Sequence, residues 1–197
     1  MDKFPKTITL RDGSEVVIRP MVSEDEIPLL TFFQHVPKED LLYLMDNVTN
    51  PAVVRRWATE LDYERVLPLL AFDGDRVVGN ATLHRFKTGL FRHIGEIRCL
   101  IASDMRSKGL GSQLTGELFR LALDEGLELI QARILESQKQ AARMFQALGL
   151  KTIANLPNYA KDAKGNRHNV LLMISDVEEL WARYSDFLMD LDVKTMY

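Results

Sequence analysis

The feature that most constrains the fold of this chain is a basic turn with two glycines, set between an apolar strand and an amphipathic helix. Residues 94–101 form an apolar run of strand length, and residues 112–125 repeat leucine at helical spacing until Gly126 stops the pattern. A further apolar run follows at 127–135. Two neighbouring strands joined through a helix must be parallel. The sequence therefore predicts a β-α-β crossover inside a mixed α/β domain.

The turn itself has the sequence Arg-Ser-Lys-Gly-Leu-Gly at 106–111 and suits a phosphate group. A helix that opens on such a turn offers unpaired backbone N–H groups and the positive end of its dipole. A Walker loop is excluded, because it needs four residues between its glycines and then a Lys-Ser/Thr pair. A dinucleotide fingerprint is excluded by Leu114, which stands where the third glycine belongs. The pattern that remains is Arg/Gln-x-x-Gly-x-Gly after a strand.

With this turn the chain resembles the GNAT superfamily of acyl-CoA-dependent N-acyltransferases, in which the same turn holds the pyrophosphate of coenzyme A. The segment 136–150 resembles the helix motif Asn-x-x-Ala-x-x-Φ-Tyr-x-x-x-Gly-Phe of that superfamily, where Φ is apolar. Five residues match the motif in character: Ala141, Met144, Phe145, Gly149 and Leu150. The resemblance covers about residues 15–175. It implies the GNAT fold, a central twisted mixed β-sheet flanked by helices, as a domain over 1–175 with an extra helical extension over 176–197.

Composition sets the outer bounds on function. The 197 residues fit one domain, and 46% hydrophobic with 27% charged residues is usual for a globular protein. The net charge of −3 argues against nucleic acid as a partner, and no apolar run approaches the ~20 residues that span a membrane. Cys99 is the single cysteine, and His35 and His168 have no partner at metal-ligand spacing, so we expect neither a disulfide nor a metal. The N-terminus lacks a signal-peptide core, so we expect a cytoplasmic protein.

The remaining elements follow from turn and capping signals. Alternating residues at 7–10 and 15–19 flank Arg-Asp-Gly-Ser, a strong hairpin signal. Helices are predicted after the capping-box spacing at 23–26 and after Asn50-Pro51, the latter with Val53, Trp57 and Leu61 on one face. Further predicted features are strands at 66–72, 76–84 and 151–154, a turn at 158–167 and a strand-like run at 169–174.

The chemistry implied by the resemblance requires an amine that becomes nucleophilic. A lysine amine is neutral in roughly one molecule in a thousand at pH 7, so a carboxylate that takes its proton assists the attack. Glu96 is the outstanding candidate, because it stands in a largely apolar strand. Its alternative role is a structural ion pair with Arg98 or Arg92. The entry segment 10–20 resembles that of the bacterial Pat-type protein lysine acetyltransferases, whose base is a glutamate thirteen residues before the first turn glycine, as Glu96 is here.

The resemblance also implies a cofactor site and a carbonyl-polarising backbone. A backbone N–H near Leu100 or Ile101 would polarise the thioester carbonyl. Gln138 replaces the usual asparagine, and Phe145 replaces the tyrosine that protonates the departing thiolate. That acid role is then vacant, filled by water, or taken by Tyr159. Tyr159 stands in a predicted polar loop, and its alternative role is that of a surface tyrosine. The expected cofactor-binding residues are Leu100, Ile101, Arg106, Ser107, Lys108, Gly109, Leu110, Gly111, Ser112, Gln138 and Phe145.

The implied function is transfer of acetyl from acetyl-CoA to an amine, by direct attack in a ternary complex. The acceptor is a protein lysine or a small amine, and the sequence does not decide between them. A non-catalytic acyl-CoA-binding module is the alternative, supported by Phe145. A covalent acyl-cysteine on Cys99 is a lesser alternative. Cys99 can be present simply as a small buried hydrophobic residue, which needs no chemical role.

The C-terminal segment predicts one further helix. Ser175-x-x-Glu178 has capping-box spacing, and an apolar stripe follows. Such a stripe would be covered by its own domain or by a second subunit in a homodimer. The stripe consists of Val177, Leu180, Trp181, Tyr184, Leu188 and Leu191.

Overall fold

The computed structural model describes residues 3–41, 46–162 and 164–195, with the side chains of 38, 39 and 187–195 outside the description. The chain forms two compact units. The first comprises Met1–His84 and Arg98–Thr115, and the second Arg85–Ile97 and Gly116–Tyr197. Strand β5 (Ile94–Ile101) and helix α4 (Leu110–Asp124) each contribute residues to both units.

The first unit contains an antiparallel sheet in the order β1-β2-β3-β4. The predicted hairpin is confirmed, with Gly13 at a φ of 83° in its turn. The end of β5 adjoins β4, because the Ala102 N–H donates to the Val78 carbonyl at 2.9 Å. The strands are β1 (Lys6–Thr9), β2 (Glu15–Pro20), β3 (Val66–Asp73) and β4 (Arg76–Arg85).

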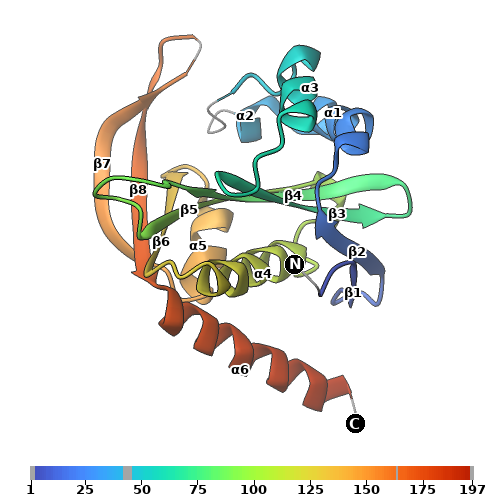
Figure 1. Ribbon diagram of the computed structural model, residues 1–197. Coiled ribbons are helices and arrows are strands. Elements are labelled where there is room, and N and C mark those ends of the chain that lie inside the picture. Colours follow the sequence, from blue (N-terminus) through green and yellow to red (C-terminus); the bar gives the residue numbers. More distant parts are fainter. Residues whose placement is uncertain (1–2, 42–45, 163, 196–197) are drawn as a thin grey trace. The chain divides into compact units, whose positions relative to one another are not determined.

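Helices α1 and α3 cover one face of this sheet, as Figure 1 shows above β3 and β4. Asn50 caps α3 through its side chain, which accepts the Ala52 N–H at 3.0 Å. The face of α3 that is fully buried contains Val54 and Ala58, while the predicted Trp57 lies at its edge. The elements are a short 3₁₀ turn η1 (Ser23–Asp25), α1 (Glu26–His35), α2 (Lys38–Leu41) and α3 (Pro51–Thr59).

The predicted crossover joins β5 to β6 (Leu129–Leu135) through α4, and the two strands pair within the second unit. β5 is parallel to β6, and the order continues through antiparallel β8 (Arg167–Asp176) to β7 (Lys151–Lys161). Helix α5 (Lys139–Ala147) forms over the second motif. The predicted turn at 158–167 is wrong in extent, because β7 continues to Lys161 through a register shift between Leu156 and Ala160. The mixed α/β class with a mixed sheet and flanking helices is as predicted.

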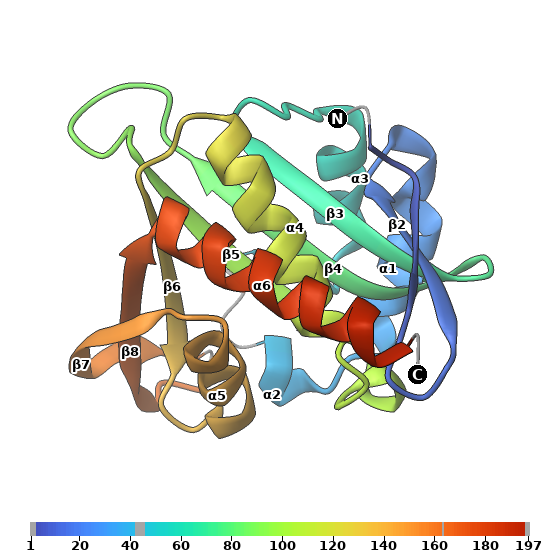
Figure 2. The same cartoon turned by 90° about the horizontal axis from the view of Figure 1, so that it is seen from below.

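Helix α6 (Val177–Thr195) packs within the second unit through its described side chains. Val177, Leu180 and Tyr184 are fully buried, and Figure 2 shows α6 crossing α4. The crossing depends on Gly116, since a Cβ there would overlap the Tyr184 ring. The stripe residues Leu188 and Leu191 have side chains outside the described part, and a dimer contact stays a prediction.

The cap of α6 differs from the expected capping box. The Asp176 carboxylate accepts the N–H groups of Glu178 at 2.8 Å and Glu179 at 3.2 Å. Ser175 instead accepts the Lys151 N–H and donates to the Gly149 carbonyl. An aspartate at the helix end satisfies the free N–H groups as well as a serine does, which is why spacing alone selected the wrong residue. Among the described helices none is long and apolar enough to cross a membrane.

Candidate functional site

The glycine turn presents a row of backbone N–H groups at the start of α4. After the 3₁₀ turn η2 (Ser103–Met105), Ser107 has a φ of 63° and Gly109 a φ of 95°. The first bond of helical type at this end runs from the Gln113 N–H to the Gly109 carbonyl at 3.1 Å. The N–H groups of the three residues before Gln113 therefore precede the helical ladder and point out of the helix end. This arrangement suits an anion.

The two cations of the turn are each held by a carboxylate from elsewhere in the first unit. Arg106 donates Nη2 to Asp40 at 2.5 Å and Nε to the Ile101 carbonyl at 3.3 Å. Lys108 Nζ lies 2.8 Å from the Asp12 carboxylate. This hydrogen bond holds the pKa of Asp12 well below its usual range, helped by Ser14. Neither partner was foreseen from the sequence, because both lie far from the turn along the chain.

Glu96 is a buried carboxylate on β5 with two partners from β6. It is 6% exposed and lies opposite Gln131 in the parallel register. Its Oε2 accepts Gln131 Nε2 at 3.0 Å and Arg133 Nη2 at 2.5 Å. The structural role considered for Glu96 pairs it with Arg98 or Arg92, and its two partners on β6 were not predicted. The signal was present in the alternation of β6, which buries Ile130, Ala132 and Ile134 and leaves the polar residues between them on the other face.

The end of β5, whose backbone was expected to polarise the thioester carbonyl, contacts both the apolar core and the glycine turn. Leu100 is 4% exposed and belongs to the apolar core of the first unit. The Ile101 carbonyl is occupied by Arg106. Cys99 is a half-buried residue whose thiol is desolvated, which raises its pKa to about 12. A raised thiol pKa disfavours the thiolate and argues against Cys99 as a nucleophile.

Three expected site residues of the second unit have different environments. The Gln138 side chain accepts the Leu135 N–H at 3.1 Å and so closes the end of β6. Phe145 is 4% exposed and is a core residue of α5. Tyr159 lies on strand β7, not in the polar loop that was expected, and is 60% exposed. The strand extends further because the bulge after Leu156 absorbs the irregular residues.

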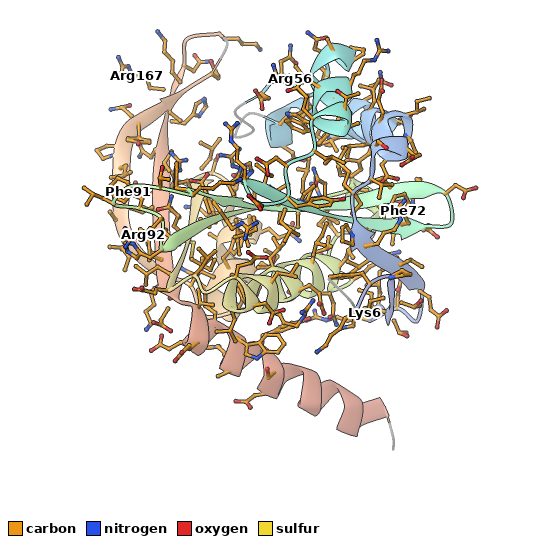
Figure 3. The ribbon with its side chains drawn as sticks, in the orientation of Figure 1. Lys6, Arg56, Phe72, Phe91, Arg92 and Arg167 are labelled. Atoms are coloured by element: carbon orange, nitrogen blue, oxygen red, sulfur yellow. The ribbon has the colours of Figure 1, made fainter. Side chains whose placement is uncertain are left out.

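The loop between β4 and β5 exposes large apolar side chains just before Glu96 in the chain. Phe86, Leu90 and Phe91 are 55%, 85% and 62% exposed. Figure 3 shows Phe91 and Arg92 projecting from this loop. Single exposed apolar residues are normal, but here three lie within six positions of one loop.

Comparisons with known proteins bear on the family and the fold. The family model described as "Acetyltransferase (GNAT) family" matches residues 33–150. An acetyltransferase of the GNAT family from Streptococcus pneumoniae has 21% identity and a TM-score of 0.72, over 82% of this chain and 99% of that chain.

Two further solved structures share the fold. The GNAT domain of S. lividans PAT has 18% identity and a TM-score of 0.70, over 87% of this chain and 96% of that chain. YncA from Salmonella typhimurium was solved with its cofactor acetyl-CoA. It has 19% identity and a TM-score of 0.71, over 83% of this chain and 95% of that chain. The family match spans more than half of the sequence, and the chain therefore belongs to the GNAT acetyltransferase family.

Proposed function

We propose that this GNAT acetyltransferase uses acetyl-CoA and transfers the acetyl group directly to an amine, with Glu96 as the base. The observation that carries the proposal is the glycine turn, in which the positive φ values of Ser107 and Gly109 lead into the free N–H groups of α4. That cradle fits a pyrophosphate, because several preorganised amides bind it at once.

The residues from Arg106 to Ser112 would hold the phosphates of the cosubstrate. Acetyl-CoA supplies an acetyl group activated as a thioester. Most of the phosphate contacts would come from backbone amides, because Arg106 and Lys108 already have carboxylate partners. The role of the Leu100 and Ile101 backbone as donor to the thioester carbonyl is part of this proposal.

Glu96 would receive the proton that the amine loses. The proton moves from the amine nitrogen to a Glu96 oxygen, directly or through water, as the new N–C bond forms. The ion pair with Arg133 holds the carboxylate in place. Gln131 holds the same oxygen and so fixes the side-chain rotamer. These contacts support a preorganised base.

The acid that protonates the departing thiolate is proposed to be Tyr159 or water. Phe145 carries no exchangeable proton, and its burial fits a packing role. Tyr159 is an exposed phenol on β7 and therefore has a proton to give. The alternative of a non-catalytic acyl-CoA-binding module draws on this same substitution at Phe145.

The acceptor is a protein lysine or a small amine. Three exposed apolar side chains favour a protein acceptor, because a protein can bury them whereas a small polar amine cannot. They are Phe86, Leu90 and Phe91.

Calorimetric titration with acetyl-CoA, paired with thiol release across a panel of amines and lysine-containing proteins, tests the proposal. We expect binding together with thiol release that depends on an acceptor. Binding without release for any acceptor would support the binding module instead, and the absence of binding would overturn both functions. The panel also separates the acceptor classes, because the rate of thiol release should saturate with increasing acceptor concentration for only one class.

A further inference from the structure

The hairpin between β1 and β2 is attached to the glycine turn. The Arg11 N–H donates to the Lys108 carbonyl at 3.0 Å, and Lys108 Nζ forms an ion pair with the Asp12 carboxylate at 2.8 Å. The hairpin is itself closed by the Leu10 N–H to Ser14 carbonyl bond of 2.8 Å. Backbone and side-chain contacts together therefore fix the Arg11 backbone beside the turn.

The Arg11 side chain lies along Gly109. A Cβ built on Gly109 would stand 3.5 Å from Arg11 Nε and 3.6 Å from its Cγ. The arginine stem thus packs over the residue that immediately precedes α4, where the free N–H groups of the helix begin. This packing places the start of the guanidinium group, Nε, near the end of the helix.

The other cations near this surface are engaged by carboxylates. Asp12 holds Lys108 and Asp40 holds Arg106. In the part of the chain that the structure describes, Arg11 is exposed and has no ion pair. A guanidinium offers five donors in a fork that matches two phosphate oxygens, and it remains charged at every relevant pH.

We propose that Arg11 binds the pyrophosphate of acetyl-CoA, and that the Lys108–Asp12 ion pair positions it by clamping the hairpin to the turn. The inference rests on the proposed function. The hairpin lies outside residues 33–150, so Arg11 belongs to a segment that the family match does not include. The cosubstrate site is in this way built from two segments about a hundred residues apart in the sequence.

Calorimetric titration of acetyl-CoA into wild type, Arg11→Gln, Arg11→Lys and Arg65→Gln tests the assignment. Arg65 is an exposed arginine of the same unit, so its change removes the same charge away from the hairpin. We expect Arg11→Gln to weaken binding roughly 10- to 100-fold, as for the loss of charge-assisted hydrogen bonds. Arg11→Lys should recover part of the loss, and Arg65→Gln should stay within about twofold of wild type. Thermal unfolding of each variant confirms that it is folded.

The same titration with 3′-dephospho-acetyl-CoA identifies the phosphate. A pyrophosphate contact predicts that Arg11→Gln weakens both ligands by the same factor. A loss confined to the ligand with the 3′-phosphate would overturn the pyrophosphate assignment, and equal binding by Arg11→Gln and wild type would overturn the role of Arg11 altogether. If wild type itself binds no acetyl-CoA, the proposed function fails, which is a distinct result.

Discussion

Arg133 Nη2 lies 2.5 Å from Glu96 Oε2, so the carboxylate expected to act as a base is held by a cation from the neighbouring strand. The pair joins side chains of very different exposure, 30% for Arg133 and 7% for Glu96. A buried carboxylate is stable when it is paired and hydrogen-bonded, as it is here by Arg133 and Gln131. The same contacts therefore explain how a charge is tolerated inside the second unit and why its geometry is fixed.

Replacement of Gly111 by valine is expected to abolish most binding of acetyl-CoA. A branched side chain in the first turn of α4 would obstruct the approach of phosphate to the N–H groups. Arg106→Ala should weaken binding less, because Arg106 is engaged by Asp40 and one partly exposed ion pair contributes little. Calorimetry on the two variants checks the order. Wild-type affinity in Gly111→Val would refute the phosphate turn.

Replacement of Tyr159 by phenylalanine tests the proposed acid. If the phenol protonates the thiolate, turnover should fall by roughly 10²-fold, with acetyl-CoA binding unchanged. Because Tyr159 is 60% exposed, the change should leave the melting temperature almost unaltered. Steady-state thiol release measures the effect. Unaltered turnover in the folded variant would assign the proton to water.

The thiol of Cys99 is expected to resist alkylation in the folded protein. Desolvation raises its pKa to about 12, whereas a cysteine in an unfolded chain has a pKa near 8.5. At pH 8 the reactive thiolate should be roughly 10³-fold rarer in the folded state than in urea. Because the folded pKa is raised, this contribution to stability is present below about pH 8.5 and is lost as pH rises toward 12. Iodoacetamide labelling followed by mass spectrometry measures the difference, and equal rates in both states would contradict it.

The packing of α6 on α4 predicts that Gly116→Ala lowers the free energy of unfolding when Tyr184 is present and raises it when Tyr184 is replaced by alanine. Alone, the added methyl group overlaps the Tyr184 ring and should lower the free energy of unfolding by about 1–3 kcal/mol. In a Tyr184→Ala background the overlap is gone. The same change should then stabilise α4 by up to about 1 kcal/mol, because alanine is the better helix former. Urea unfolding of the four proteins tests this, and the same sign in both backgrounds would contradict the contact.

The sequence predicted most elements of this fold because their signals are local. The strand 94–101 matches β5 at both ends, and Asn50-Pro51 begins α3 as expected. The predictions that failed concern features for which neighbouring residues offer equivalent hydrogen-bonding groups or for which the sequence has no pattern. Asp176 caps α6 in place of Ser175, and β7 passes through a bulge that has no sequence pattern of its own.

The sequence identifies candidate site residues but not their contacts. Glu96 and the glycine turn could be identified because both depart from their apolar surroundings. The partners Arg133, Asp40 and Asp12 could not, because an ion pair between distant segments requires the strand order and the hairpin position. Such contacts belong to tertiary structure, which no spacing within one segment encodes.

The most direct test of the central claim is the pH dependence of turnover in Glu96→Gln beside wild type, with a lysine-type acceptor. The substitution keeps the size of the side chain and removes the base. Between pH 6 and pH 8 we expect turnover to fall by roughly 10²–10⁴-fold with acetyl-CoA affinity nearly intact. The loss should shrink as pH rises toward the pKa of the acceptor, because more of the amine is then already neutral. Equal turnover by folded Glu96→Gln and wild type at every pH would contradict Glu96 as the base and leave it as the structural partner of Arg133.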